Sequence, residues 1–219
     1  MSFSSRNSFF CSNWTPLPYR ENEILNIYRF IVSSFESESP MVLSVCGETG
    51  CGKTSTVKLC SMMSDFSDRI EYHENMDENY IIDWINDDHR KLIIIDRPKS
   101  VLIIPLITES VISNKSLIVI TEKPIKYTHL EGVSLNYISF RSYRYEEIRA
   151  IFFELFGSFK YCFDNQSIDY VSQIVTFNGL PLRTGIECVN ISIKQLRSSK
   201  KKKIDHEMIR AIVEKIVLE

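Results

Sequence analysis

The sequence lacks any apolar run close to the roughly 20 residues that a membrane-spanning helix needs. Residues 1–11 are rich in serine and contain no apolar core of a secretion signal. We therefore expect no membrane association and an intracellular location. The formal net charge is only -2 and the pI is near 6.1, which argues against a protein that coats nucleic acid by bulk charge, although a local basic patch is compatible with these totals.

Paired cysteines and metal-ligand spacings are also missing. The six cysteines stand at positions 11, 46, 51, 60, 162 and 188, and the sequence has no C-x-x-C pair and no histidine cluster. This scatter is typical of buried thiols in a reducing compartment. Cys51 differs from the others because it lies in a glycine-rich segment, where it would be open to oxidation or alkylation.

The length and composition are those of a folded, globular chain. The 219 residues leave room for one full domain and a small one, and 44% hydrophobic with 25% charged residues is an ordinary balance. We expect a flexible tail over residues 1–15, an α/β domain over 16–144 and a small helical domain over 145–219.

Four short apolar runs predict buried strands at residues 41–46, 91–96 and 116–121 and a weaker one at 134–140. Helical periodicity or helix-start signals lie between or before them, around 24–32, 53–63, 81–86 and 101–113. Strands that alternate with helices imply a parallel sheet covered on both faces. After residue 145 only helical patterns occur, over 146–156, 165–176, 181–196 and 205–217, with a basic connector at 197–203.

Glycine is scarce, yet three of the seven glycines fall in one octet. The octet fits G-x-x-x-x-G-K-[ST] at every position, between an apolar strand and a helix: Gly47-Glu48-Thr49-Gly50-Cys51-Gly52-Lys53-Thr54. Glycines let backbone N–H groups close around phosphates, and the helix N-terminus adds its positive dipole end. Lys53 is expected to reach the β- and γ-phosphates and Thr54 to ligate Mg²⁺. The octet therefore predicts a nucleoside triphosphate site that takes ATP and Mg²⁺, and we include the following Ser55 in it.

A second nucleotide element is expected at the end of a buried strand, where Asp96 stands. Its carboxylate would hold Mg²⁺, usually through water. In an ATPase the next residue is commonly a glutamate that polarises the attacking water. Here it is Arg97, and a guanidinium cannot act as a general base at neutral pH. The sequence therefore predicts ATP binding more strongly than ATP hydrolysis, and no catalytic residue is assigned.

Several segments resemble the AAA+ initiator ATPases of DNA replication, namely the largest subunit of the eukaryotic origin recognition complex and its licensing-factor and archaeal relatives. Leu17-Pro18-Tyr19-Arg20-Glu21-Asn22-Glu23 is similar to the family's L-P-x-R-E-x-E segment. The run from Ser139 to Ile148 is like the F-x-P-Y entrance to the family's helical lid. Gly179-Leu180-Pro181-Leu182-Arg183 lies where the family has G-D-x-R, and Lys203 to Met208 resembles the start of the last lid helix.

The resemblance implies a P-loop AAA+ sheet domain followed by an all-helical lid. It places Tyr19 and Arg20 near the adenine and makes Arg183 the sensor of the γ-phosphate. It implies a nuclear subunit that assembles with other AAA+ subunits of an origin recognition or licensing complex. Because the chain ends where the family's winged-helix DNA-binding domain would begin, we expect contact with origin DNA only within that complex.

This chain departs from the family in three places. Asp96-Arg97-Pro98-Lys99 replaces D-E-x-D, Thr128-His129-Leu130 replaces S-R-L, and no sensor asparagine is evident around Thr121 and Glu122. Three interpretations therefore stay open: a subunit that uses ATP as a structural or switching ligand, an active ATPase that draws on another acid or a partner subunit, and a scaffold with a vestigial site.

Some further side chains have two interpretations each. Lys200 to Lys203 fit a phosphate contact, a nuclear localisation signal or a solvated loop. Arg141 and Arg144 fit a role at a neighbouring subunit's ATP or a surface ion pair. The aromatic rings of Phe140, Tyr143 and Tyr145 fit base stacking or the protein core.

Overall fold

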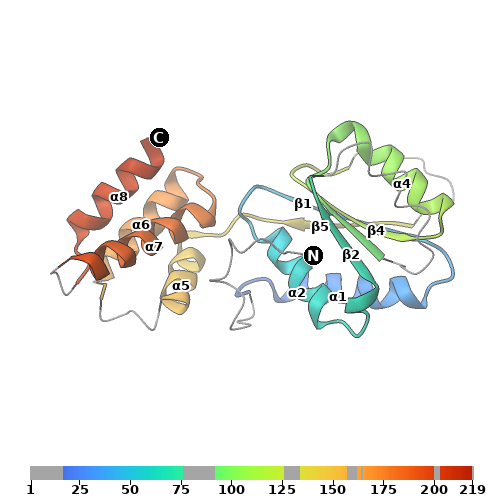
Figure 1. Cartoon of the computed structure of the whole chain (residues 1–219), viewed down its shortest axis with the longest axis horizontal. Coiled ribbons are helices and arrows are strands. Elements are labelled where there is room, and N and C mark those ends of the chain that lie inside the picture. The colour runs from blue at the N-terminus through green and yellow to red at the C-terminus, as the bar shows by residue number, and fades with distance from the viewer. Residues whose placement is uncertain are drawn as a thin grey trace.

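The computed structural model describes residues 17–75, 92–125, 134–156, 162–163, 165–199 and 203–218. Figure 1 shows an α/β lobe and a helical lobe joined by the segment that leads from β5 into α5. The predicted tail at 1–15, the helix at 81–86, the Thr128-His129-Leu130 segment and lysines 200–202 lie outside the described residues. Among the described helices, none is both long and apolar enough to cross a membrane.

The α/β lobe is built on one parallel sheet in the order β2-β3-β4-β1-β5. Its strands are β1 (Met41–Gly47), β2 (Ile70–Glu74), β3 (Leu92–Asp96), β4 (Ser116–Thr121) and β5 (Ser134–Phe140). The continuous apolar runs form the three interior strands, and every residue of β3 is buried. The predicted α/β fold with a parallel sheet is confirmed.

The strand β2 was not predicted. Its sequence Ile-Glu-Tyr-His-Glu is polar at three of five positions and only partly buried, because β2 is an edge strand with a single neighbour. Such a strand does not produce the apolar run by which interior strands are recognised. The sheet therefore has one more strand than expected, next to β3.

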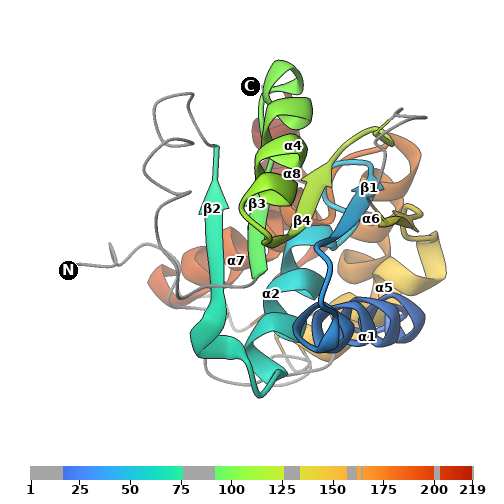
Figure 2. The same ribbon diagram turned by 90° about the vertical axis from the view of Figure 1, so that its right-hand side faces the viewer.

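Helices cover both faces of the sheet (Figure 2). Helices α1 (Glu21–Glu36) and α2 (Lys53–Met63) share a buried cluster with alternate strand residues such as Leu43 and Ile94, whereas α4 (Ile103–Ile112) packs with the opposite set, such as Val42 and Ile93. This division follows from the two-residue period of a strand. The helix expected at 101–113 starts later, because the short 3-10 turn η2 (Ser100–Leu102) precedes α4. A second 3-10 turn, η1 (Ser67–Arg69), precedes β2. Pro105 then falls in the first turn of α4, where its missing N–H costs no helical bond.

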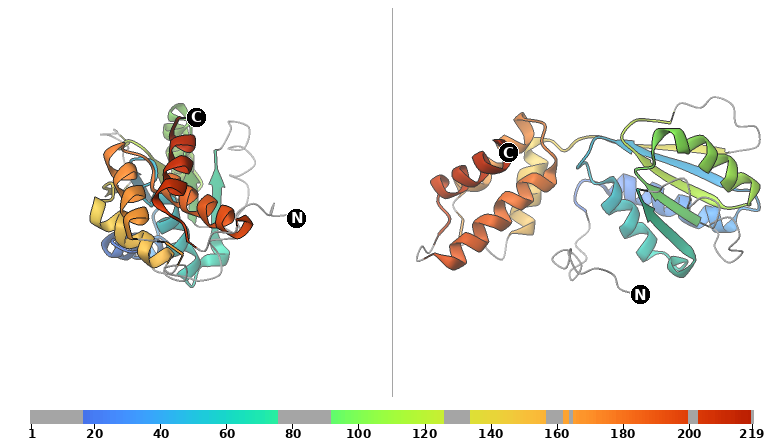
Figure 3. Two further views of the ribbon diagram at one scale, coloured as in Figure 1. Left: turned by 90° about the vertical axis from the view of Figure 1, so that its left-hand side faces the viewer. Right: turned by 45° about the horizontal axis from the view of Figure 1, so that its top comes forward.

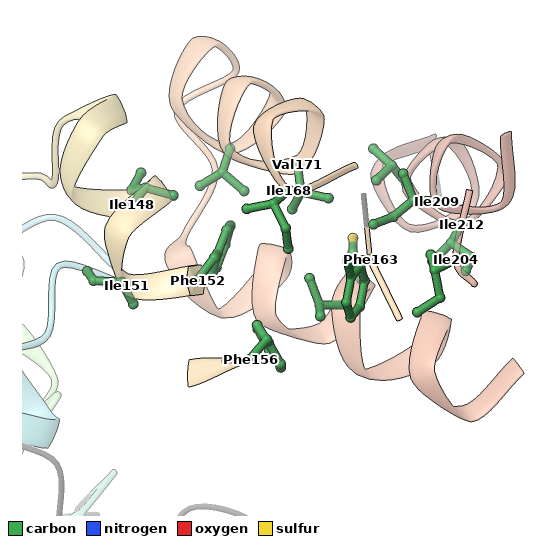
Figure 4. Close-up of a cluster of buried hydrophobic side chains, with 14 of the residues drawn as sticks. Ile148, Ile151, Phe152, Phe156, Phe163, Ile168, Val171, Ile204, Ile209 and Ile212 are labelled. Atoms are coloured by element: carbon green, nitrogen blue, oxygen red, sulfur yellow. The ribbon is translucent and has the colours of Figure 1, made fainter. Parts of the chain in front are cut away.

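Among the described residues of the second lobe there are four helices, shown apart from the sheet in Figure 3: α5 (Tyr145–Leu155), α6 (Asn165–Phe177), α7 (Leu182–Ser198) and α8 (His206–Leu218). They enclose one core that includes Phe152, Val171 and Ile209 (Figure 4). Gly185 allows close packing inside it, since a Cβ at this position would lie 2.5 Å from the Phe152 ring. This lobe, called the lid below, has a core separate from the two that flank the sheet.

Candidate nucleotide-binding site

The octet forms the connection between β1, which ends at Gly47, and α2, which begins at Lys53. Its three glycines have φ angles of 148°, 83° and 96°, a region that L side chains seldom adopt. At Gly47 the space is also closed, because a Cβ would lie 2.4 Å from the Phe140 carbonyl oxygen. The concentration of glycine in the sequence thus reflects a backbone path that other residues would strain.

Lys53 is 8% exposed, and its ammonium group faces the octet. The Nζ atom donates to the carbonyl oxygens of Gly47 at 2.6 Å and Glu48 at 2.8 Å. A cation is thereby held against the backbone of the glycine-rich loop. The role predicted for Lys53, a contact with the β- and γ-phosphates, stays a prediction.

Thr54 and Asp96 meet across the site. The Thr54 hydroxyl donates to Asp96 Oδ2 at 2.7 Å, and the Tyr72 hydroxyl donates to the same oxygen at 2.6 Å. Asp96 is 1% exposed, and its second oxygen, Oδ1, accepts no hydrogen bond from the described residues, with Arg97 Nε 3.9 Å away. A buried carboxylate oxygen without a donor, beside a threonine hydroxyl, is the oxygen chemistry that Mg²⁺ prefers, so these residues fit the predicted ion.

Tyr72 was not anticipated from the sequence, because it belongs to the unpredicted strand β2. Burial, followed by the hydrogen bond to Asp96, raises the pKa of the Tyr72 hydroxyl well above its ordinary value. The hydroxyl therefore stays protonated and remains a donor to the carboxylate. No group of three or more acidic, histidine or cysteine ligands occurs among the described residues, so Mg²⁺ would depend on phosphate oxygens for further ligands.

Arg97 pairs with Glu74, and its Nε also lies 3.9 Å from Asp96 Oδ1. It is 54% exposed, has a φ of 56°, and its guanidinium pairs with Glu74 at the end of β2. Glu74 and Asp96 are direct partners in the β2–β3 register, so the pair of Arg97 and Glu74 links the end of β3 to the edge strand β2. The position where an ATPase commonly carries a glutamate thus holds a cation that is engaged with the edge strand.

Arg20 lies between the octet and the entrance to the lid. Its side chain is fully buried, donating from Nε to the Cys51 carbonyl at 3.1 Å and from Nη2 to the Arg141 carbonyl at 2.7 Å. The guanidinium also stacks over the Tyr143 ring at 4.0 Å, and a third bond reaches Glu23. With no exposed surface, Arg20 is placed to join the octet to the lid entrance.

Tyr19 is 41% exposed and borders a polar cavity of about 490 Å³ between the first turn of α1 and the end of β5. No octet residue lines this cavity. The predicted contact of Tyr19 with adenine therefore stays a prediction. Ser55 is exposed on the first turn of α2, next to Thr54.

The lid touches the octet at its third helix. A Cβ on Gly50 would lie 2.6 Å from Pro181 Cβ and 3.1 Å from the backbone nitrogen of Leu182, where α7 begins. Arg183 is exposed in that first turn. The structure thus brings the predicted sensor arginine to the helix end that faces the octet, and its contact with a γ-phosphate stays a prediction.

Other residues at the lid entrance bond to the octet and to α5. Ser142 donates to the Glu48 carboxylate, and Arg141 forms a two-bond ion pair with Glu147. The hydrogen bond from Arg141 is the main reason why the pKa of Glu147 falls to about 2. Phe140 and Tyr143 are buried, as expected for core side chains.

Sequence reasoning missed one carboxylate that contacts the octet. Glu122 directly follows β4, and its Oε1 accepts a hydrogen bond from the Thr49 hydroxyl at 2.6 Å. Its backbone carbonyl accepts from the Gly47 N–H at 3.3 Å. The available signal was its position after a buried apolar run, at the same sheet edge as the octet.

The cysteines of the described residues are free thiols. Cys51 is 2% exposed and burial raises the pKa of its thiol, although Lys53 opposes that shift. A buried, protonated thiol is a poor nucleophile. The reactivity expected for Cys51 is therefore limited by its packing in the octet.

Replacing Gly50 by alanine is expected to weaken the contact between lid and octet. Gly179→Ala is the matched control, because Gly179 also has a positive φ of 60° but no atom of the described residues lies within 4 Å of its Cβ position. Both variants carry the cost of left-handed alanine, about 1–2 kcal/mol, and only Gly50→Ala adds the collision with Pro181, about 1–3 kcal/mol more. Thermal unfolding and limited proteolysis between the lobes measure the difference, and equal behaviour of the two variants would contradict the lid contact.

The sequence matches no protein-family model and has no significant match among curated proteins. Solved structures do match. A chain of the Drosophila ORC bound to DNA has a TM-score of 0.67 at 14% identity, over 91% of this chain and 61% of that chain. Cdc6p from Pyrobaculum aerophilum has a TM-score of 0.73 at 12% identity, over 96% of this chain and 70% of that chain.

A third structure, the RuvB Holliday junction branch migration motor of Thermotoga maritima, has a TM-score of 0.62 at 12% identity, over 89% and 68%. This chain thus spans less than two thirds of the Drosophila ORC chain. Identities this low bear on the fold alone. The chain therefore shares its fold with solved structures of the replication initiators whose sequence motifs it resembles.

Proposed function

We propose that this chain is an ATP-binding AAA+ subunit of a complex that recognises or licenses replication origins, and that it uses ATP mainly as a switching ligand that it hydrolyses slowly. The observation that carries the proposal is the pairing of a complete phosphate loop, with Thr54 bonded to Asp96, and an arginine in place of the usual catalytic glutamate. The first feature supports binding, and the second supports slow turnover.

The residues of the site divide the work of binding. The octet backbone and Lys53 would hold the phosphates, while Thr54 and Oδ1 of Asp96, which accepts no hydrogen bond from the described residues, would hold Mg²⁺. Bound Mg²⁺ would neutralise charge on the phosphate oxygens. The beginning of α7 stands next to the octet, and Arg183 belongs to its first turn, so a ligand in the octet would touch both lobes.

The role in replication is supported by the initiator motifs of the sequence and by the shared fold. The Drosophila ORC structure is bound to DNA, and we propose by analogy that this chain meets origin DNA within an assembly of AAA+ subunits in the nucleus. The RuvB motor has the same fold, so turnover is the property that separates a switch from a motor.

A binding assay beside a turnover assay tests the proposal. We expect a fluorescent ATP analogue to bind in the presence of Mg²⁺, and single-turnover hydrolysis to be at least about 100-fold slower than a typical enzyme rate of ~10 s⁻¹. Hydrolysis at a typical rate would favour an active ATPase, and absence of binding would favour a scaffold with a vestigial site.

Arg97→Glu is expected to raise turnover, since it restores an acid beside Asp96.

A further inference from the structure

The proposed function leaves open which group ends the ATP-bound state. A switch that hydrolyses ATP slowly still needs a base for the attacking water, and Arg97 cannot supply one. The described residues place four carboxylates at or near the carboxyl edge of the sheet, those of Glu48, Glu74, Asp96 and Glu122. Their contacts differ enough to separate them.

Three of these carboxylates are committed elsewhere. Asp96 accepts from Thr54 and Tyr72 and forms the predicted Mg²⁺ site. Glu48 accepts from Ser142 at the lid entrance. Glu74, at the end of β2, is paired with Arg97. In the sheet order β2 lies three strands from β1, or about 14 Å at ~4.8 Å per strand.

Glu122 is placed differently, because β4 is the direct neighbour of β1. Its main chain is bonded to Gly47, the first residue of the octet, and its carboxylate to Thr49, the third. The side chain is exposed, so water reaches it. The carboxylate thus lies against the octet itself and is open to solvent.

We propose that Glu122 is the general base for ATP hydrolysis in this chain, an inference that rests on the proposed function. The oxygen of a water molecule would bond to the γ-phosphorus while the bond from that phosphorus to the β–γ bridging oxygen breaks. The proton of the water passes to the Glu122 carboxylate, and ADP and inorganic phosphate are released. The Thr49 hydroxyl donates to Oε1 of this carboxylate, so the second oxygen, Oε2, is the atom that would accept the proton.

The test compares Glu122→Gln with Glu74→Gln. Glutamine at 122 can still accept the Thr49 hydrogen bond, so the octet keeps its anchor while the base is lost. We expect single-turnover hydrolysis by Glu122→Gln to fall about 100-fold. We also expect its affinity for ATP relative to ADP to rise about fivefold, because a negative charge near the γ-phosphate is removed. Glu74→Gln should change neither quantity.

Each other outcome has a distinct meaning. ATP binding with the same hydrolysis rate in Glu122→Gln and the unmodified chain would overturn the inference and leave the proposed function standing. The inference would also be overturned if the unmodified chain binds ATP without any single-turnover hydrolysis, or if Glu74→Gln loses as much activity as Glu122→Gln. Absence of ATP binding to the unmodified chain would overturn the proposed function itself.

Discussion

Lys53→Ala is expected to lower the affinity for ATP by about 100-fold. The ammonium group of Lys53 lies inside the octet and donates to two of its carbonyl oxygens, so it is positioned to exchange them for phosphate oxygens. Hydrogen bonds to charged groups contribute about 1.5–3 kcal/mol each, and about 2.7 kcal/mol corresponds to a factor of 100. Titration with a fluorescent ATP analogue measures the loss.

Lys58→Ala is the control for that experiment. Lys58 is on the same helix and exposed, with its Nζ 4.3 Å from the centre of the Tyr72 ring instead of in the octet. Its removal takes away the same charge from α2 without touching the loop. ATP affinity should therefore be nearly unchanged, and a similar loss in both variants would mean that net charge alone attracts the nucleotide.

Arg20→Ala is expected to destabilise the protein by about 3–5 kcal/mol, the usual effect of removing one partner from a buried ionic network. Arg20 has no exposed surface, and its guanidinium donates to Cys51 in the octet and to Arg141 at the lid entrance. For a chain of this size each kcal/mol shifts the melting temperature by roughly 2–4 °C. Thermal unfolding should thus show a decrease of about 10 °C, together with weaker ATP binding.

Two comparison variants test the explanation for Arg20. Arg20→Lys keeps the charge but loses the planar fork that reaches two carbonyl groups at once, so it should fall between the unmodified chain and Arg20→Ala. Arg210→Ala removes an arginine whose pair with Glu214 is exposed on α8, and it should leave the melting temperature unchanged. If Arg20→Ala and Arg210→Ala have the same melting temperature, the buried hydrogen bonds of Arg20 do not contribute to stability.

The sequence was most informative where burial is symmetrical. Strands β1, β3 and β4 are covered on both faces, so their residues are apolar in succession and the pattern is visible without a structure. Strand β2 has one neighbour and several polar residues, including Tyr72 and Glu74. Its partners are fixed by sheet order, a property that no local pattern carries.

The same distinction applies to the candidate site. The octet and Asp96 were recognised because each depends on residues that are adjacent in the chain. Tyr72 and Glu122 contact Asp96 and Thr49 across 24 and 73 positions respectively. Their relevance arises only when parallel strands bring their carboxyl ends to one edge.

The octet, from which nucleotide binding was predicted, is thus determined by the sequence itself. Its glycines set the backbone path, and its lysine and threonine come next to the last glycine in the chain. The tertiary structure decided which residues surround it. Arg20 is buried between the octet and the lid, and the start of α7 contacts Gly50. Arg97 pairs with Glu74, and Glu122 is bonded to Thr49. These contacts join residues far apart in the chain, and they form because packing the sheet and the lid fixes distances that sequence spacing does not.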